Sequence, residues 1–321
     1  MTTETSTPVS ESHRARGTLF ILVASTAFAS SGPLAKPVMQ AGFAPEQVAS
    51  ARAGLAALML LVGVAVVRPS VLRVRREHWR VVVAYGLIGV AAVQFLFFLA
   101  VSRLPVGVAM LLEYTSPVLV ALWVRFVRRV RLPALSWLGT GLALGGLALV
   151  SQVWSGLALD AVGLLAGVGA ALCSAGYYLL GEKGAGEQHP IGMVTWGMAV
   201  GAAGLFVLAP PWEMPLDRLG APARLGGAEL PIWVLLVTVA AVSTAIAYAL
   251  STTSLRDLPS QVASVLALSE PVVATLLAWL LLGEVLEPVQ IAGMVVLLGG
   301  ALLVQLATRT PVTPAEPLPT K

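Results

Sequence analysis

The sequence predicts an all-α integral membrane protein with ten transmembrane helices, arranged as two inverted five-helix repeats. Three observations carry this prediction: a charged fraction of only 11% in 321 residues, ten long apolar segments, and an internal repeat. Soluble domains carry roughly 25% charged residues, so this chain has too few to keep its surface in water. The net charge of +4 does not indicate nucleic acid, because the basic residues lie in short loops without interleaved aromatic residues.

The ten apolar segments are each long enough to cross a bilayer, which takes about 20 apolar residues in a helix. Two polar tails flank them, 1–17 and 308–321, and both are predicted to be disordered. The predicted spans are 18–38, 46–67, 80–102, 104–126, 134–152, 160–181, 190–210, 231–254, 258–282 and 288–307.

Basic residues are concentrated on one side of this predicted topology. Most arginines precede the first span or follow the second and fourth, and only a few fall on the other side. Cytoplasmic loops of membrane proteins carry the excess of Lys and Arg. Both termini are therefore predicted to be cytoplasmic, in the inner membrane of a bacterium.

An internal repeat relates the two halves of the chain. A shift of 154 residues aligns residues 104–150 with 258–304 without a gap, and 15 of these 47 positions are identical. Matched glycines and prolines mark shared requirements of the backbone. The matches are Leu104–Pro105 with Leu258–Pro259, Pro117 with Pro271, Gly139 with Gly293, and Gly145–Gly146 with Gly299–Gly300.

The repeat unit contains five helices, so the repeat predicts a transporter. Because five is odd, the second copy must enter the membrane in the opposite orientation to the first. Inverted repeats are typical of transporters that alternate access around a central site. The alternative is a duplication that only makes a stable bundle.

Three ionisable residues, Arg52, Glu113 and Glu270, lie well inside predicted spans. A charge at the bilayer centre costs roughly 2.5–3.5 kcal/mol on insertion scales, so such residues usually face a cavity or a partner. At about 1.5 Å per residue, both glutamates lie near the middle of their spans. They are candidate proton or substrate sites; for Glu113 a buried ion pair or a structural role is the alternative.

The repeat places the two glutamates on the same face of equivalent helices, one turn apart. Each is followed by a proline, Pro117 or Pro271, which has no N–H and leaves the carbonyl four residues earlier without a helical partner. A freed carbonyl beside a carboxyl makes a polar notch that must face protein or water. A carboxyl in such a low-dielectric site can load and release a proton near neutrality.

Arg52 could receive an anionic group of a substrate through a bidentate contact. It could equally neutralise a glutamate or extend to the membrane surface. In the first span, Gly32 and Pro33 belong to a segment rich in helix breakers, which should kink the outer half and expose polar backbone to a ligand.

Further polar and aromatic residues are candidate cavity liners, although each could be simple packing. Gln94 and Tyr248 are equivalent at the 154-residue shift. Three glycine pairs are spaced as in helices that pack closely: Gly141/Gly145, Gly163/Gly167 and Gly197/Gly201. The other candidate liners are Tyr114, Trp196, Tyr177 and Tyr178.

Motifs of other protein classes do not occur in the sequence. The loop 181–186 lacks the spacing of an ATP-binding loop, and no zinc-protease motif occurs. The single cysteine, Cys173, forms no internal disulfide, and a Cys/His metal site cannot be assembled. No enzyme activity, cofactor or metal is therefore expected.

The Pro-anchored fourth and ninth spans resemble those of the EamA family within the drug/metabolite transporter superfamily. The resemblance rests on Leu104–Pro105 with the segment 113–117, Leu258–Pro259 with the segment 269–272, and Gly283–Glu284. The segment 111–121 is especially similar to the threonine/homoserine exporter group. This resemblance implies efflux of amino acids or related metabolites, driven by protons. The first half departs from the pattern with Arg129–Val130 in place of Gly–Glu.

These observations predict a secondary active transporter that exports small polar metabolites by alternating access. Its partners would be a small-molecule substrate, protons and the lipid bilayer, and it could assemble with further copies. A passive facilitator or exchanger, a multidrug carrier, and a non-transporting scaffold or receptor are the alternatives.

Overall fold

The computed structural model describes residues 11–104, 106–152, 160–225, 227–282 and 285–307, most of which are helical. Pro105 and the Gly283–Glu284 pair, which contribute to the sequence analysis, lie outside these residues, as do 1–10 and 308–321.

The first helix, α1, begins at Glu11, so the prediction of a disordered tail is wrong for residues 11–17. The reason is a tertiary contact. Arg16 donates two hydrogen bonds of 2.9 Å to the carboxylate of Asp257, more than 200 residues away. Such bidentate pairs fix geometry strongly and hold the start of the helix in place.

The first half of the chain forms five membrane passes, three of which contain a break or a local change of helix type. Its helices are α1 (Glu11–Ala29), α2 (Ser31–Gln40), α3 (Pro45–Val67), η1 (Pro69–Leu72), η2 (Arg76–His78), α4 (Trp79–Gly86), η3 (Leu87–Ala92), α5 (Val93–Val101), α6 (Val106–Glu113), α7 (Ser116–Phe126) and α8 (Ala134–Val150).

The second half repeats this order, with an added hairpin of strands β1 and β2 where the sequence suggests only a loop. Its elements are α9 (Ala161–Glu187), α10 (Pro190–Leu208), η4 (Pro211–Glu213), η5 (Leu216–Arg218), β1 (Pro222–Leu225), β2 (Ala228–Pro231), α11 (Ile232–Ala240), η6 (Ala241–Ile246), α12 (Ala247–Ser254), α13 (Ser260–Leu266), α14 (Ser269–Leu282) and α15 (Pro288–Ala307).

Within the described residues, nine helical passes are long and apolar enough to cross a membrane. The tenth pass, α8, is a shorter apolar helix of 17 residues. Large apolar side chains cover the outside of the bundle; Leu165 and Val207, for example, are 74% and 82% exposed. The ten predicted spans are therefore present as helices, and their outer surface suits lipid.

Proline residues set the breaks in three passes. Pro33 cannot donate to the carbonyl of Ala29, and helix α1 ends at that residue. Likewise α6 ends at Glu113, because Pro117 has no N–H to donate to the carbonyl of Glu113. The breaks let the chain change direction inside the bundle.

Pro271 acts differently from the prediction. The carbonyl of Ala267 is not freed, because it accepts the N–H of Glu270 at 2.9 Å. A tighter turn therefore replaces the lost helical bond, and helix α14 starts again at Ser269.

Two π-helical segments occupy equivalent positions in the two halves. Segment η3 spans Leu87–Ala92 and η6 spans Ala241–Ile246, and the 154-residue shift superimposes their bounds. A π-helical segment widens the helix and is common at functional sites. Nothing in the sequence analysis indicated these segments.

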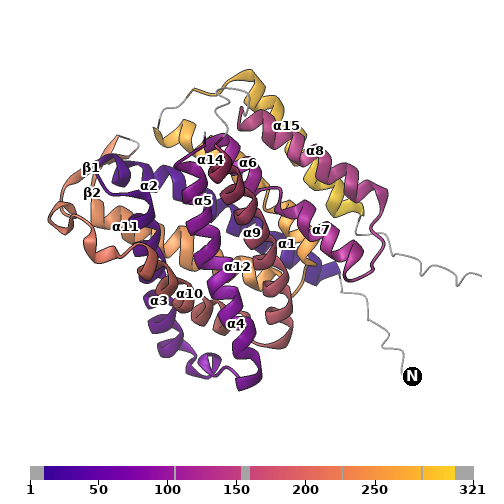
Figure 1. Ribbon diagram of the computed structural model, residues 1–321, viewed down its shortest axis with the longest axis horizontal. Helices are drawn as coiled ribbons and strands as arrows, with labels where there is room; N and C mark the ends of the chain where they lie inside the picture. Colours follow the sequence, from indigo (N-terminus) through magenta and orange to yellow (C-terminus); the bar gives the residue numbers. More distant parts are fainter. Residues whose placement is uncertain (1–10, 105, 153–159, 226, 283–284, 308–321) are drawn as a thin grey trace, which may run out of the picture.

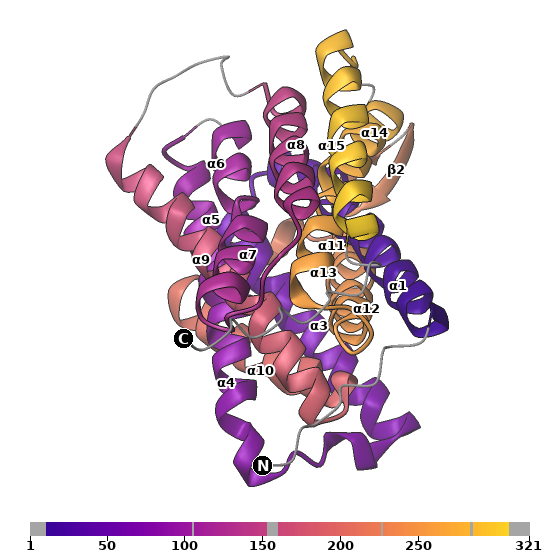
Figure 2. The same cartoon turned by 90° about the vertical axis from the view of Figure 1, so that its right-hand side faces the viewer.

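Helices α8 and α15 lie side by side in both views (Figures 1 and 2). A Cβ added at Gly139 would lie 2.7 Å from the carbonyl oxygen of Gly300, and one at Gly146 would lie 2.6 Å from that of Gly293. The repeat relates Gly139 to Gly293 and Gly146 to Gly300, so the contact is antiparallel and exchanges the two halves. This crossing is direct evidence of an inverted repeat.

Gly141 and Gly145, expected at a close helix contact, have nothing within 4 Å of an added Cβ. The prediction is wrong for this pair, because the α8–α15 contact follows a seven-residue spacing and not a four-residue one. It is confirmed for Gly163/Gly167 and Gly197/Gly201, where each added Cβ would lie 2.5–2.7 Å from an atom of a neighbouring segment.

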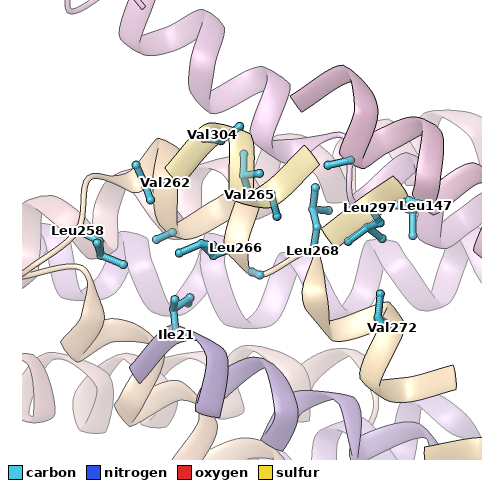
Figure 3. Packing of buried hydrophobic residues seen from close by; sticks show 14 of the residues in the cluster. Ile21, Leu147, Leu258, Val262, Val265, Leu266, Leu268, Val272, Leu297 and Val304 are labelled. Atoms are coloured by element: carbon cyan, nitrogen blue, oxygen red, sulfur yellow. The ribbon is translucent and has the colours of Figure 1, made fainter. Parts of the chain in front are cut away.

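The largest hydrophobic core lies where the second half packs on the first. Figure 3 shows Ile21 of α1 facing Leu266 and Leu258 of the α13 region, with Leu147 of α8 close to Leu297 of α15. This core joins α1 and α8 of the first half to α13 and α15 of the second.

Candidate functional site

A cavity of about 450 Å³ lies inside the bundle, and most of the predicted site residues line it. Its walls come from α2, α3, α5, α6 and α14, and it extends toward the end of the molecule that holds Met39, Pro45 and Val101. The predicted residues on its walls are Gly32, Arg52, Gln94, Glu113, Tyr114, Tyr177, Tyr178, Tyr248 and Glu270.

Arg52 is the cation of the cavity. One terminal nitrogen donates to the Ser31 hydroxyl, and the other donates to Oε1 of Gln94 at 2.5 Å. Its Nε is buried and has no hydrogen-bond partner in the part of the chain that the structure describes. The guanidinium is thus held by neutral groups, and its Nε–H makes no hydrogen bond to the described residues.

The two glutamates lie on the wall of the same cavity, at the helix breaks. Glu113 is the last residue of α6, and Glu270 is in the first turn of α14. Each carboxyl is close enough to Arg52 and to the other carboxyl to interact electrostatically. Among the described residues neither lies within 4.0 Å of Arg52, so these three charges form no closed ion pair.

Tyr114 follows Glu113 in the break of the fourth pass, and it lines the same cavity as Glu270 of α14. The breaks of the two halves therefore face one space.

Four aromatic rings form the floor of the cavity. The ring of Tyr248 meets Phe28 edge-on at 5.1 Å and Tyr177 at 5.6 Å, and Tyr177 meets Tyr178 at 5.0 Å. Such edge-to-face contacts favour one fixed arrangement of the rings. The floor separates the cavity from the opposite end of the bundle.

Hydrogen bonds beneath the floor tie three passes together. The Tyr177 hydroxyl donates to Ser251 at 2.8 Å, and the hydroxyls of Tyr85 and Thr252 lie 2.8 Å apart. All of these oxygens belong to buried groups, where a satisfied hydrogen bond is costly to break. The cavity is thus sealed on this side.

The break in the first pass contacts a π-helical segment. The hydroxyl of Ser30, the single residue between α1 and α2, lies 2.7 Å from that of Ser243 in η6. Sequence reasoning did not single out Ser243. The 154-residue shift could not have revealed it, because the contact joins non-equivalent helices.

Four predicted residues do not line the cavity. Pro33, Pro117 and Pro271 act on the backbone at the breaks. Trp196, predicted as a liner, packs against Trp79 with ring centroids 5.3 Å apart, and its indole N–H donates to the carbonyl of Leu72 at 2.9 Å.

This fold and cavity define a class of protein, a polytopic helical membrane carrier with a central polar site. The chain belongs to the EamA-like transporter family, whose profile matches it twice, over residues 15–152 and 161–306. It is a multi-pass membrane transporter and not an enzyme.

The chain is similar to named transporters along most of its length. It is 30% identical over 288 residues to the threonine/homoserine exporter RhtA of Salmonella typhimurium (strain SL1344), covering 88% of this chain and 89% of that one. The RhtA of Escherichia coli (strain K12) is 30% identical over 277 residues, with 85% of each chain covered. The uncharacterized transporter YwfM of Bacillus subtilis (strain 168) is 27% identical over 300 residues, covering 91% and 94%.

A crystal structure of a protein 21% identical in sequence shares the fold. Its TM-score is 0.72, and the match covers 92% of this chain and 98% of that one.

Proposed function

We propose that this protein is a proton-coupled exporter of small amino acids that works by alternating access. The observation that carries the proposal is the cavity in which Arg52, Glu113 and Glu270 face one space without a closed ion pair. A free amino acid carries one carboxylate and one ammonium group. A site with a guanidinium and carboxyls matches both.

Arg52 would bind the substrate carboxylate. Its Nε–H is unused, and the fork of a guanidinium suits a carboxylate. Glu270 or Glu113 would bind the ammonium group. The cavity volume of about 450 Å³ lies in the range of sites for small molecules, and the aromatic floor would contact the side chain of the substrate.

The proton coupling follows from a count of charges. Arg52 with two ionised carboxyls leaves a net negative charge inside the membrane, which is costly. One proton on Glu113 or Glu270 makes the site neutral. The ammonium group of an entering amino acid would compete with this proton for a carboxylate. Binding of the substrate would therefore release the proton, and release of the substrate would allow a proton to bind again.

The topology supports an outward-facing state. The arginine-rich loops after α3 and α7 are taken as cytoplasmic. Met39, Pro45 and Val101, toward which the cavity extends, then lie near the outside, and the sealed end with Tyr85 and Thr252 faces the cytoplasm.

The relatives support the choice of substrate, because two of them are named threonine/homoserine exporters. The alternatives differ in what they need: a passive facilitator or exchanger needs no proton site, a multidrug carrier needs no carboxylate-binding arginine, and a scaffold or receptor needs neither.

The test is transport by the purified protein in liposomes with an imposed pH gradient, using threonine, homoserine and an amphipathic cation. We expect gradient-dependent flux of the amino acids. Glu113→Gln should abolish the dependence on the gradient, and Arg52→Lys should raise KM about tenfold or more, as for a lost charge-assisted hydrogen bond. Glu213→Gln, which changes an exposed carboxyl at the end of the short helix η4, is the matched control and should not change transport.

Folded protein without any gradient-dependent flux of amino acids would refute the proposal. Flux that persists without the gradient in all variants would favour a facilitator. Preference for the amphipathic cation would favour a multidrug carrier.

A further inference from the structure

The loops that join the third and fourth passes of each half have the same backbone conformation. In the second half, the N–H groups of Asp257 and Leu258 both donate to the carbonyl of Ser254, at 3.0 and 2.9 Å. In the first half, Arg103 and Leu104 both donate to Ala100, at 3.0 and 2.8 Å. These residues are equivalent at the 154-residue shift, so the two turns are matched parts of opposite ends of the molecule.

Each turn packs against a glycine at the start of the first pass of the other half. A Cβ added at Gly17 would lie 2.8 Å from both Cβ of Asp257 and Cγ of Leu258. A Cβ added at Gly163 would lie 3.0 Å from Cβ of Arg103 and 2.7 Å from Cγ of Leu104. The same cross-half contact therefore occurs twice.

A charged residue lies one to three residues before each glycine and pairs with the charged residue of the turn. Arg16 precedes Gly17 and pairs with Asp257. Asp160, three residues before Gly163, pairs with Arg103. Each pair joins the start of the first pass of one half to the turn between the third and fourth passes of the other half, and the signs of the charges are exchanged between the two pairs.

The two pairs differ in how tightly they are closed. Arg16 and Asp257 form two hydrogen bonds of 2.9 Å, and the Asp257 side chain is only 4% exposed. Arg103 and Asp160 are 3.8 Å apart, and their side chains are 46% and 42% exposed. The loose pair lies at the end toward which the cavity extends, close to Val101.

We propose that these two ion pairs are alternating latches of the transporter. The tight Arg16–Asp257 pair holds the sealed end closed in the present state, and the Arg103–Asp160 pair closes in the opposite state while Arg16 and Asp257 separate. In an inverted repeat, the opposite state corresponds to an exchange of the conformations of the two halves, so each latch takes the geometry of the other. The latches are positioning residues, because they do not touch the cavity.

This inference rests on the proposed alternating access but not on the substrate or on protons. It can therefore be tested without transport. The 154-residue shift relates Met110, which lines the present cavity, to Ser264, which is 2% exposed at the sealed end. Ser264 should line the cavity of the opposite state.

The experiment measures how fast single cysteines react with a charged, water-soluble maleimide in the purified protein. Cys173→Ala removes the one native cysteine. The reporters are Met110→Cys and Ser264→Cys, each introduced separately. In the otherwise unchanged chain, the Met110→Cys reporter should react quickly and the Ser264→Cys reporter slowly.

Asp257→Asn opens the tight latch, so the Ser264→Cys reporter should react at least about tenfold faster and the Met110→Cys reporter more slowly. Asp160→Asn removes the loose latch and should shift both reporters in the opposite direction. Exchanging the pair, with Arg16→Asp and Asp257→Arg together, should restore the original rates, which a merely structural defect would not allow.

Arg224→Gln is the matched control, since Arg224 pairs with Glu229 within the β1–β2 hairpin and this ion pair does not connect the two halves. It should leave both rates unchanged. If folded Asp257→Asn and Asp160→Asn variants shift the reporters in the same direction, or not at all, the latch proposal is wrong. If the two variants shift the reporter rates in opposite directions but the protein transports no amino acid, only the proposed substrate is refuted.

Discussion

The antiparallel contact between α8 and α15 makes a sharp prediction, because each half offers two adjacent glycines that differ in their surroundings. A Cβ at Gly146 would lie 2.3 Å from the backbone nitrogen of Leu297 and 2.6 Å from the carbonyl oxygen of Gly293. A Cβ at Gly145 would have nothing within 4 Å. Alanine should therefore be tolerated at residue 145 and not at residue 146.

The magnitude follows from two effects. Replacing a glycine inside a helix with alanine stabilises the helix by about 0.5–1 kcal/mol, and both variants share this gain. Gly146→Ala also forces backbone apart, and overpacking of this kind costs about 1–3 kcal/mol. Gly146→Ala should thus be less stable than Gly145→Ala by about 1–3 kcal/mol.

The assay is reversible unfolding of both variants in the same detergent micelles. Gly300→Ala and Gly299→Ala form the equivalent pair of the second half, with 2.4 Å to the nitrogen of Ala143 for the first and open space for the second. They should differ in the same direction. Equal stability within both pairs would refute the α8–α15 geometry and with it the evidence for inversion.

Three further predictions concern the floor, the cation and one loop residue. Tyr177→Phe keeps the ring but loses the hydrogen bond to Ser251, so the equilibrium should shift by about 0.5–1.5 kcal/mol toward the opposite state, measured with the thiol reporters; an unchanged ratio contradicts the seal. Gln94→Ala releases one arm of Arg52 and should raise KM more than it lowers kcat; a selective loss of kcat would contradict a binding role. Burial and nearby arginines lower the pKa of His189, whose ring accepts the N–H of Ile191 at the start of α10. The stability that neutral His189 adds is present above about pH 6.5 and is lost as pH falls through the lowered pKa. His189→Asn should therefore make the melting temperature less sensitive to acid, and equal sensitivity would argue against this role.

Much of the fold follows from the sequence, because the bilayer imposes simple rules. Apolar length defines the passes, and prolines mark the breaks at Ala29 and Glu113. Because a charge inside the membrane is costly, Arg52 and Glu270 could be predicted as site residues, and both line the cavity.

Features that depend on tertiary contacts were not predictable. The π-helical segments η3 and η6 have no mark in composition, since they arise from a register shift that neighbouring helices stabilise. Trp196 is aromatic and intramembrane like the true liners, but its partner Trp79 lies at a helix start that the sequence does not place beside it. Which glycines touch depends on the crossing of two helices, which spacing alone does not specify.

The central claim is that one cavity binds both charged ends of an amino acid, and competition by capped substrates tests it most directly. The measurement is inhibition of homoserine uptake into liposomes by free threonine, by its methyl ester and by its N-acetyl derivative. The account predicts that threonine competes and that each capped form competes about tenfold or more weakly, since each leaves Arg52 or the carboxyls of Glu113 and Glu270 without a partner. Equal competition by either capped form would contradict it.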